Sequence, residues 1–484
     1  MEMDQTVASH ASSAVTLSTQ EKALAINLDA TKYGTFVEIG AGQEVARWFF
    51  HVGHASATVA KSMSAYDMVI SDILYGATDH YVSRARLESM LEREWTQLLE
   101  RLDSVRGERT GFFVFADTVA THSRARNRDG QGWLGMRFQP QPRAPYSQII
   151  IHVNLLDQVP VSEQEALGIL GVNLAYGAFH QQKPEAVMKM LMEGLSRQRV
   201  DIDMIKFSGP VFEKVDNRLA SLQLVELGLT DAAMFTAKGE VVQPAEVIYK
   251  KPVLVSRGSF RPVTNVGLDM LNAAMERFRK IPGVDGEPVE VMEMTLHNLS
   301  SEGPEIDRRD FLDRADVLGA LGKTVVVTNF TRFDSVTTSL RRYTPQWLGF
   351  VMGVPTLRAL FDEQYYTSLP GGILEGLGRL FMGNVRLYVY PALDRITGQV
   401  STSTTLELTH PLIHLLEYLR DKGGIEALED FDTSQLRVFP KEVLSAIQNG
   451  TPGWEQYLPP HAAEVIKQRA LFGYRATAAD DSIL

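Results

Sequence analysis

The chain has 484 residues, too many for one simple hydrophobic core, and its 44% hydrophobic and 22% charged residues are typical of soluble globular proteins. Its formal charge of -11 argues against general nucleic-acid binding, because such binding depends on neutralising phosphates. The chain contains no cysteine, which excludes disulfides, thiolate zinc sites, iron–sulfur clusters and cysteine nucleophiles.

The N-terminal stretch does not resemble a targeting signal. Residues 1–20 lack the basic segment followed by an apolar core that marks a secretory signal, and their Ser, Thr and Ala content predicts a disordered tail over 1–27. No stretch of the chain approaches the roughly 20 apolar residues of a membrane span. We therefore expect a cytoplasmic protein with no membrane span.

Residues 28–158 predict an α+β region. A β-rich run, 34–40, leads through Gly40-Ala41-Gly42 into an amphipathic helix at 44–50. Such a turn could hold a phosphate, but the third glycine of a dinucleotide motif is missing, so an ordinary tight turn is the stronger interpretation. Two helices and then three strands are predicted further on, at 57–76, 84–104, 111–123, 132–142 and 147–157.

Residues 159–400 predict a mainly parallel α/β core. Helices are expected at 162–180 and 184–196. Short apolar runs then alternate with stretches long enough for a helix, which favours a Rossmann-like or barrel-like arrangement of βα units. These runs are 201–209, 231–236, 252–262, 289–298, 323–333, 347–356 and 385–391. Residues 401–484 predict a small helical cap, with helices at 410–421, 440–448 and 460–471.

The predicted site lies where these strands end. Parallel strands and barrels bind ligands at their carboxyl ends, which face helix N-termini. Glu293 and His297 are the candidates for proton transfer, because a histidine titrates near neutrality and Glu293 lies on a buried strand. The candidates for binding a phosphate or carboxylate are the guanidinium, hydroxyl and amide side chains of Arg257, Ser259, Arg261, Asn298, Asn329, Arg332 and Thr356.

Structural roles fit the same residues. Arg257 could pair with an acidic residue, Glu293 could close a buried salt bridge, and His297 could cap a helix. The histidines are scattered, so no metal site is predicted, and the sequence does not identify a cofactor. P-loop, H-E-x-x-H and G-x-S-x-G motifs are absent from the sequence.

Motifs along most of the chain resemble one bacterial family of similar length. They include YGTFVEIGAGQEVARWFF, KSMSAYDM, FADTVA, QEALGILGVNL, VDNRLASLQLV, GLTDAAMF, RGSFRPVT, LGALGKTVVVTNF, MGVPTLRALFDEQYY and GGILEGLGRLF, from about residue 28 to about 475. Members of that family carry two conflicting labels, TonB-dependent receptor and nicotinate-nucleotide adenylyltransferase. The receptor label conflicts with the sequence, because a receptor barrel needs many segments of alternating polarity, whereas this chain offers continuous apolar strands between helices.

The adenylyltransferase label can be compared with two segments. That superfamily binds ATP phosphates with an H-x-G-H motif just after its first strand and with a second Ser/Thr-rich motif at a late helix N-terminus. This chain is similar at His51-Val52-Gly53-His54 and at Thr337-Thr338-Ser339-Leu340-Arg341-Arg342. The helix predicted at 44–50 separates the first motif from its strand, which departs from the superfamily pattern.

Two classes of function stay open. One is an enzyme, such as a transferase, that binds a nucleotide or phosphorylated metabolite at the carboxyl ends of the strands, with nucleotidyl transfer as an alternative. The other is a non-catalytic protein that uses the same scaffold to sense a ligand or to assemble, for example as a homo-oligomer.

Overall fold

The computed structural model describes residues 16–122, 129–300, 303, 305–429 and 431–475. The chain forms two compact units. The first runs to Ile202 and also includes Phe207–Val215, and the second consists of Asp203–Lys206 and the chain from Asp216 onwards. Both units mix helices and strands, which confirms the predicted α/β class.

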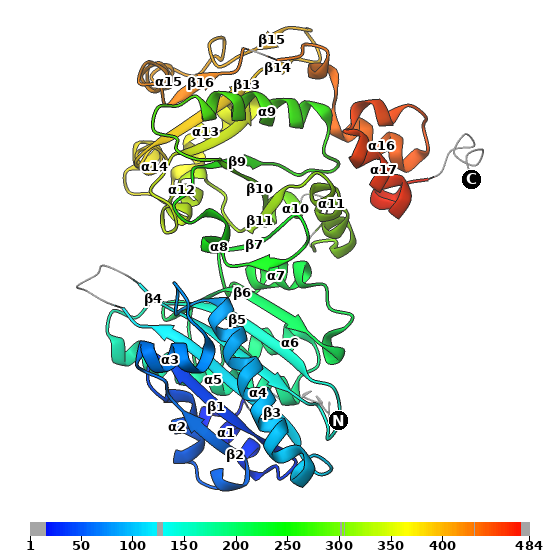
Figure 1. The fold of residues 1–484 in the computed structure, drawn as a ribbon. Coiled ribbons are helices and arrows are strands. Elements are labelled where there is room, and N and C mark those ends of the chain that lie inside the picture. The colour runs from blue at the N-terminus through cyan, green and yellow to red at the C-terminus, as the bar shows by residue number, and fades with distance from the viewer. Residues whose placement is uncertain (1–15, 123–128, 301–302, 304, 430, 476–484) are drawn as a thin grey trace, which may run out of the picture. The chain divides into compact units, whose positions relative to one another are not determined.

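A six-stranded sheet forms the first unit, in the order β2-β1-β3-β4-β5-β6 (Figure 1). β1 pairs in parallel with β2 and β3, whereas β4 is antiparallel to both β3 and β5. The strands are β1 (Lys32–Ile39), β2 (Val59–Met63), β3 (Gly111–Ala120), β4 (Gly130–Phe138), β5 (Ser147–Leu155) and β6 (Val200–Ser208).

Helices cover both faces of this sheet. Leu87 and Leu91 of α4 lie against Gly135 of β4 on one face. On the other face, Gly171 of α5 lies against Val45 of α2 and Phe115 of β3, an approach that a larger side chain would block. The helices are α1 (Thr19–Leu28), α2 (Glu44–His51), α3 (Met68–Tyr75), α4 (Arg84–Arg106), α5 (Pro160–His180) and α6 (Pro184–Leu191).

Three predictions for this part of the chain were wrong. Residues 19–27 of the predicted disordered tail belong to α1, which starts with a capping box between Ser18 and Glu21; residues 1–15 of that tail lie outside the described residues. The helix expected at 57–76 is a strand, β2, followed by α3. β6 was expected to be the first strand of the parallel core, but it belongs to the first sheet, where it lies beside β5. Just after β6, the N–H of Val211 donates to Ser147 Oγ at 3.0 Å.

The second unit is built on an open eight-stranded sheet, in the order β16-β13-β12-β9-β10-β11-β7-β8 (Figure 1). The strands from β16 to β11 are parallel, whereas β7, expected to be parallel, runs antiparallel to β11. In the described part of the chain this sheet does not close, because β16 and β8 form its two edges, which favours the Rossmann-like over the barrel-like arrangement. The strands are β7 (Ala232–Phe235), β8 (Val241–Val242), β9 (Val253–Arg257), β10 (Val289–Thr295), β11 (Thr324–Thr328), β12 (Leu348–Gly353), β13 (Val385–Tyr390) and β16 (Ile425–Ala427).

Helices also cover both faces of this second sheet. α9 lies on one face, where Phe278 packs edge-on against Tyr388 of β13, and α12 lies on the other, where Phe333 meets Phe350 of β12. The helices are α7 (Asn217–Glu226), α8 (Pro244–Ile248), α9 (Asn265–Arg279), α10 (Leu296–Leu299), α11 (Arg308–Ala320), α12 (Phe333–Arg341), α13 (Val354–Leu360), α14 (Gly372–Leu380), α15 (Leu412–Asp421), α16 (Pro440–Asn449) and α17 (Pro460–Arg469).

The C-terminal part is not only a helical cap. α15, α16 and α17 form as predicted, but the chain between α15 and α16 adds β16 to the edge of the sheet, and β14 (Ala392–Leu393) pairs with β15 (Val400–Ser401). The predicted domain limits at 27, 158 and 400 stay predictions.

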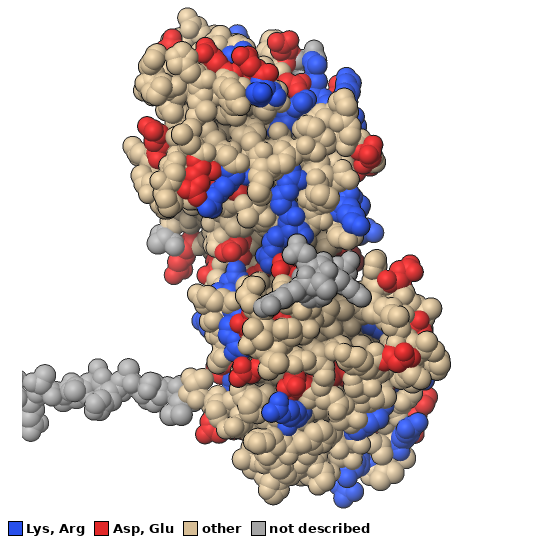
Figure 2. Space-filling model, turned by 90° about the vertical axis from the view of Figure 1, so that its left-hand side faces the viewer, with Lys and Arg blue, Asp and Glu red and all other residues tan. Residues whose placement is uncertain are grey.

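The described surface carries charges of both signs. On the face seen in Figure 2, Lys and Arg side chains and Asp and Glu side chains are distributed over both units. None of the helices in the described part of the chain is long and apolar enough to cross a membrane.

Candidate functional site

The strand order of the second unit defines a specific position for a ligand. From β9 the chain adds β10 and β11 on one side and then returns to add β12, β13 and β16 on the other. The order therefore reverses between β9 and β12. Open α/β sheets bind ligands outside the carboxyl ends of the strands at such a switch point, where the loops of the two neighbouring strands diverge. Here these are the segment 258–264, between β9 and α9, and the start of α13 after β12.

Arg257 and Glu293 form a closed pair at this pole. They lie directly opposite each other on β9 and β10. Arg257 donates from Nε and Nη2 to the two carboxylate oxygens of Glu293, both at 2.9 Å, and Thr328 of β11 donates to the same carboxylate at 2.7 Å. The Glu293 side chain is completely buried and that of Arg257 is only 11% exposed. This buried bidentate pair carries no net charge. Together with the hydroxyl of Thr328, it links β9, β10 and β11.

A second ionic group joins the loop after β9 to α11. It was not predicted from the sequence. Arg261 pairs with Asp310 of α11, and the other oxygen of Asp310 accepts from Arg314, one turn along the same helix. Arg314 also donates to the backbone carbonyls of Ser259 at 3.0 Å and Asn298 at 3.4 Å. Arg314 thus ties the loop after β9 to the loop after β10. The only sign of this ionic group in the sequence was the i, i+4 spacing of Asp310 and Arg314, which is typical of an ion pair within a helix.

The remaining predicted residues lie around the same pole. Arg332 pairs with Asp334 of α12 and donates to Ser368 at 3.2 Å, and the Asn329 amide donates to Asp231 at 2.9 Å. His297 is exposed on the short helix α10, and Thr356 is half-buried in the first turn of α13. The strand ends therefore gather the predicted residues at one edge of the sheet, but all three predicted arginines are held by carboxylates.

Open backbone donors remain at the switch point. α9, a helix of 15 residues, begins after Thr264 without a side-chain cap, whereas α11 is capped by Asp307. A Cβ built on Gly267, in the first turn of α9, would meet only Thr264 Oγ1, at 4.0 Å. Phe260, in the loop before α9, has a left-handed backbone with φ of 49°, and its ring lies against Gly258. A bulky residue in that conformation is strained, and such strain is frequent in loops that contact ligands.

The two adenylyltransferase-like segments are not brought together at this pole. The first belongs to the first unit, where His51 ends α2 and His54 follows with φ of 60°. The second lies within α12 of the second unit, so Thr337 is inside a helix rather than at its N-terminus. Arg341 donates to the backbone carbonyls of Met382, Thr344, Gln346 and Asn384, which is a structural role.

A pocket of about 470 Å³ lies in the first unit, and it contains His51. Its wall is formed by Glu44 and Trp48 of α2, together with Ser162 and Glu165 from the first two turns of α5. The pocket is of a size that accommodates small ligands and offers one aromatic ring between charges of both signs. None of the residues predicted for the strand-end site lines it.

Two buried carboxyls face each other in the sheet of the first unit. Glu38 of β1 lies opposite Asp117 of β3. Glu38 accepts hydrogen bonds from the N–H groups of Val45 and Ala46, at the start of α2, at 2.8 and 3.0 Å. Both oxygens of Asp117 are buried, and neither accepts a well-formed hydrogen bond, although the backbone N–H of Ile39 interacts with the carboxyl. Burial raises the pKa of Glu38 to about 7, and burial together with the charge of Glu38 raises the pKa of Asp117 well above its ordinary value.

The comparisons with known proteins concern about one third of the chain. No family model and no curated protein matches it. Among solved structures, a competence/damage inducible protein from Agrobacterium tumefaciens matches with 17% identity and a TM-score of 0.26, covering 33% of this chain and 94% of that one. A competence or damage-inducible protein from Enterobacter asburiae matches with 11% identity and a TM-score of 0.26, covering 34% and 99%.

A third match is a competence-damaged (CinA) superfamily protein from Klebsiella pneumoniae, with 14% identity and a TM-score of 0.25, covering 33% of this chain and 96% of that one. The comparisons do not confirm either label of the bacterial family that the sequence resembles.

Proposed function

We propose that the second unit binds a nucleotide or another phosphorylated metabolite outside the carboxyl ends of β9 and β12. The observation that carries the proposal is the strand order, which reverses between these two strands. The loop 258–264 and the start of α9 follow β9 directly, so they flank the position of the reversal.

Backbone groups are the expected donors to the phosphate. Arg257, Arg261 and Arg332 are each engaged by a carboxylate, so their charge is already compensated. The uncapped N–H groups of α9 carry a partial positive charge and point to the pole of the sheet, where an anion completes their hydrogen bonding. The exposed Ser259 hydroxyl lies in the loop that leads to these groups.

A thermal-shift screen with ATP, ADP, NAD and ribose 5-phosphate tests the proposal. A ligand at 100 times its dissociation constant adds about 2.7 kcal/mol, which raises the melting temperature of a unit of this size by about 5 to 10 °C. Ser259→Glu should abolish the shift, because it places a negative charge beside the phosphate. The control is Ser445→Glu, at an exposed serine of α16, which should keep the shift. If no ligand stabilises the wild type, or if both variants respond like it, the proposal is wrong.

A non-catalytic sensor is the second candidate, and the state of Glu293 favours it. Both oxygens of Glu293 accept hydrogen bonds from Arg257, and one also accepts from Thr328, so this carboxylate is not available as a base. In the enzyme alternative, His297, which is exposed, would carry the proton transfer. His297→Gln separates the two. An enzyme would lose turnover of the bound ligand with binding unchanged, whereas a sensor would show binding without turnover in both forms.

A further inference from the structure

The helix α3 carries its apolar residues on the outside. A helix on the surface of a globular protein normally turns its apolar stripe toward the core. In α3, the buried residues are Ser71 and Tyr75, and Asp72 also lies toward the protein. Five large apolar side chains of α3 and the residues just before it are exposed: Tyr66 by 77%, Met68 by 63%, Val69 by 63%, Ile70 by 48% and Ile73 by 68%. We call these five residues the α3 patch.

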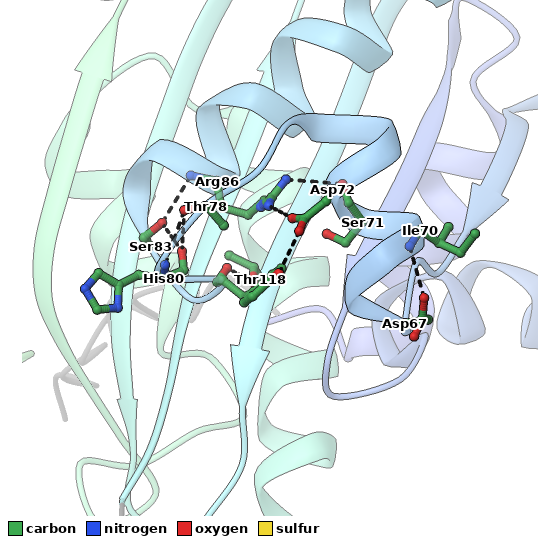
Figure 3. Close-up of polar contacts among 10 residues, drawn as sticks. Asp67, Ile70, Ser71, Asp72, Thr78, His80, Ser83, Arg86 and Thr118 are labelled. Atoms are coloured by element: carbon green, nitrogen blue, oxygen red, sulfur yellow. Dashed lines mark hydrogen bonds and ion pairs between the residues drawn. The ribbon is translucent and has the colours of Figure 1, made fainter.

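Polar contacts hold α3 firmly in this orientation. Figure 3 shows Arg86 of α4 reaching Ser71 and Asp72, with distances of 3.3 Å to the Ser71 carbonyl and 2.8 Å to the Asp72 carboxylate. The Arg86 side chain is 1% exposed. Asp67 caps the helix by accepting from the N–H of Ile70 at 3.1 Å. The apolar side chains therefore belong to a well-anchored helix, and their exposure does not result from fraying.

The size of the α3 patch is that of an interface. Its five residues expose on the order of 600 Å², at the upper limit of what a monomer usually leaves uncovered, whereas a standard interface buries about 800 Å² on each partner. A modest contribution from neighbouring residues would complete such an interface. The α3 patch is thus large enough to form most of one contact surface.

The neighbouring elements favour a second copy of this chain as the partner. β2, which directly precedes α3, is the outermost strand of its sheet, so one of its edges pairs with no strand in the described part of the chain. An apolar patch without charges at its centre can face itself across a two-fold axis. A lipid surface fits less well, because Asp67, beside the patch, is acidic and the chain has a net charge of -11.

We propose that the α3 patch is the centre of a two-fold interface between two copies of this chain. The side chains of Met68, Ile70 and Ile73 then become buried against their counterparts, and Asp67 lies at the rim. The interface is distinct from the ligand position proposed at β9 and β12, so the two proposals stand or fall separately.

Light scattering after gel filtration of the full chain tests the interface. The wild type should elute with twice the mass of one chain, and Ile73→Glu should raise the dissociation constant by at least about 30-fold, the effect of losing one central contact. The matched control is Ile396→Glu, because Ile396 is 95% exposed in the second unit. It should leave the dimer intact. Circular dichroism checks that both variants fold.

A cysteine variant gives an independent readout, because the natural chain contains no cysteine. Ile73→Cys should form a disulfide-linked dimer under mild oxidation, and Ile396→Cys should not. The proposal is overturned if the wild type is a monomer at micromolar concentration, or if Ile73→Glu dimerises with the same dissociation constant as the wild type. It is equally overturned if the wild type is monomeric and instead sediments with phosphatidylcholine or phosphatidylglycerol vesicles in an Ile73-dependent way.

Discussion

The buried carboxyl pair of the first unit predicts a stability that falls as the pH rises. Burial raises the pKa of Glu38 from an ordinary 4.5 to about 7. The folded state therefore binds a proton more readily than the unfolded state between these two values. The resulting stabilisation is complete below pH 4.5 and is lost as the pH approaches 7, by about 3 kcal/mol for a shift of this size. Asp117, whose pKa is also raised, adds to the loss in the same direction.

Asp117→Asn tests this coupling. An amide has nearly the same shape as the acid but carries no charge, so the variant should lose part of the pH dependence and be more stable than the wild type at pH 8. Hydrogen exchange of peptides from β1 and β3 is the suitable measurement, since it reports on the first unit alone. Asp79→Asn, at an exposed position, is the control and should follow the wild type. A wild-type stability that is constant or rises between pH 4.5 and 7 would refute the reasoning.

Two further substitutions address the framework of the two sheets. Arg257→Ala should destabilise the second unit by about 3 to 5 kcal/mol in urea unfolding, because it leaves the buried Glu293 without its partner, and the double variant Arg257→Met, Glu293→Leu should recover a large part of this loss. If Arg257→Ala and the double variant lose the same free energy of unfolding, the unpaired buried charge is not the cause. Gly40→Ala should prevent the first unit from folding, as its Cβ would lie 1.8 Å from the Val119 carbonyl oxygen, whereas Gly53→Ala, also at positive φ but with nothing within 4 Å, should cost only about 1 to 2 kcal/mol. Circular dichroism and thermal melting distinguish the two, and similar losses would show that the close approach at Gly40 is unimportant.

The parallel core could be predicted from the sequence because its strands are buried on both faces. β9, β11 and β12 appear as continuous apolar runs, and the long stretches between them have room for helices. β2 was missed because its residues are only half-buried, so the run lacks both the continuous apolar character of a core strand and a clear alternation. The antiparallel direction of β7 could not be predicted either, since the sequence of a four-residue strand does not indicate whether it runs parallel or antiparallel to its neighbour.

Pairing across strands explains why the sequence could place these residues at the strand ends but could not show which side chains they contact. Arg257 and Glu293 are 36 residues apart in the sequence, and only the register of β9 against β10 places them opposite each other. Likewise, Arg261 meets Asp310, 49 residues away, only after α11 has packed against the sheet. An arginine at a strand end predicts anion binding only if it is not already paired with a carboxylate of the protein. Such pairing depends on the tertiary structure and cannot be inferred from the sequence.

The same pairing determines which variant is informative about a ligand. A phosphate that used Arg257 would have to break two hydrogen bonds to a completely buried Glu293, and this buried carboxylate would be left without compensation. A phosphate that used the N–H groups at the start of α9 would meet donors that already lack partners. Arg257→Ala changes stability and charge together, so loss of binding in that variant would have two explanations. Ser259→Glu alters only an exposed side chain, and loss of binding there locates the ligand directly.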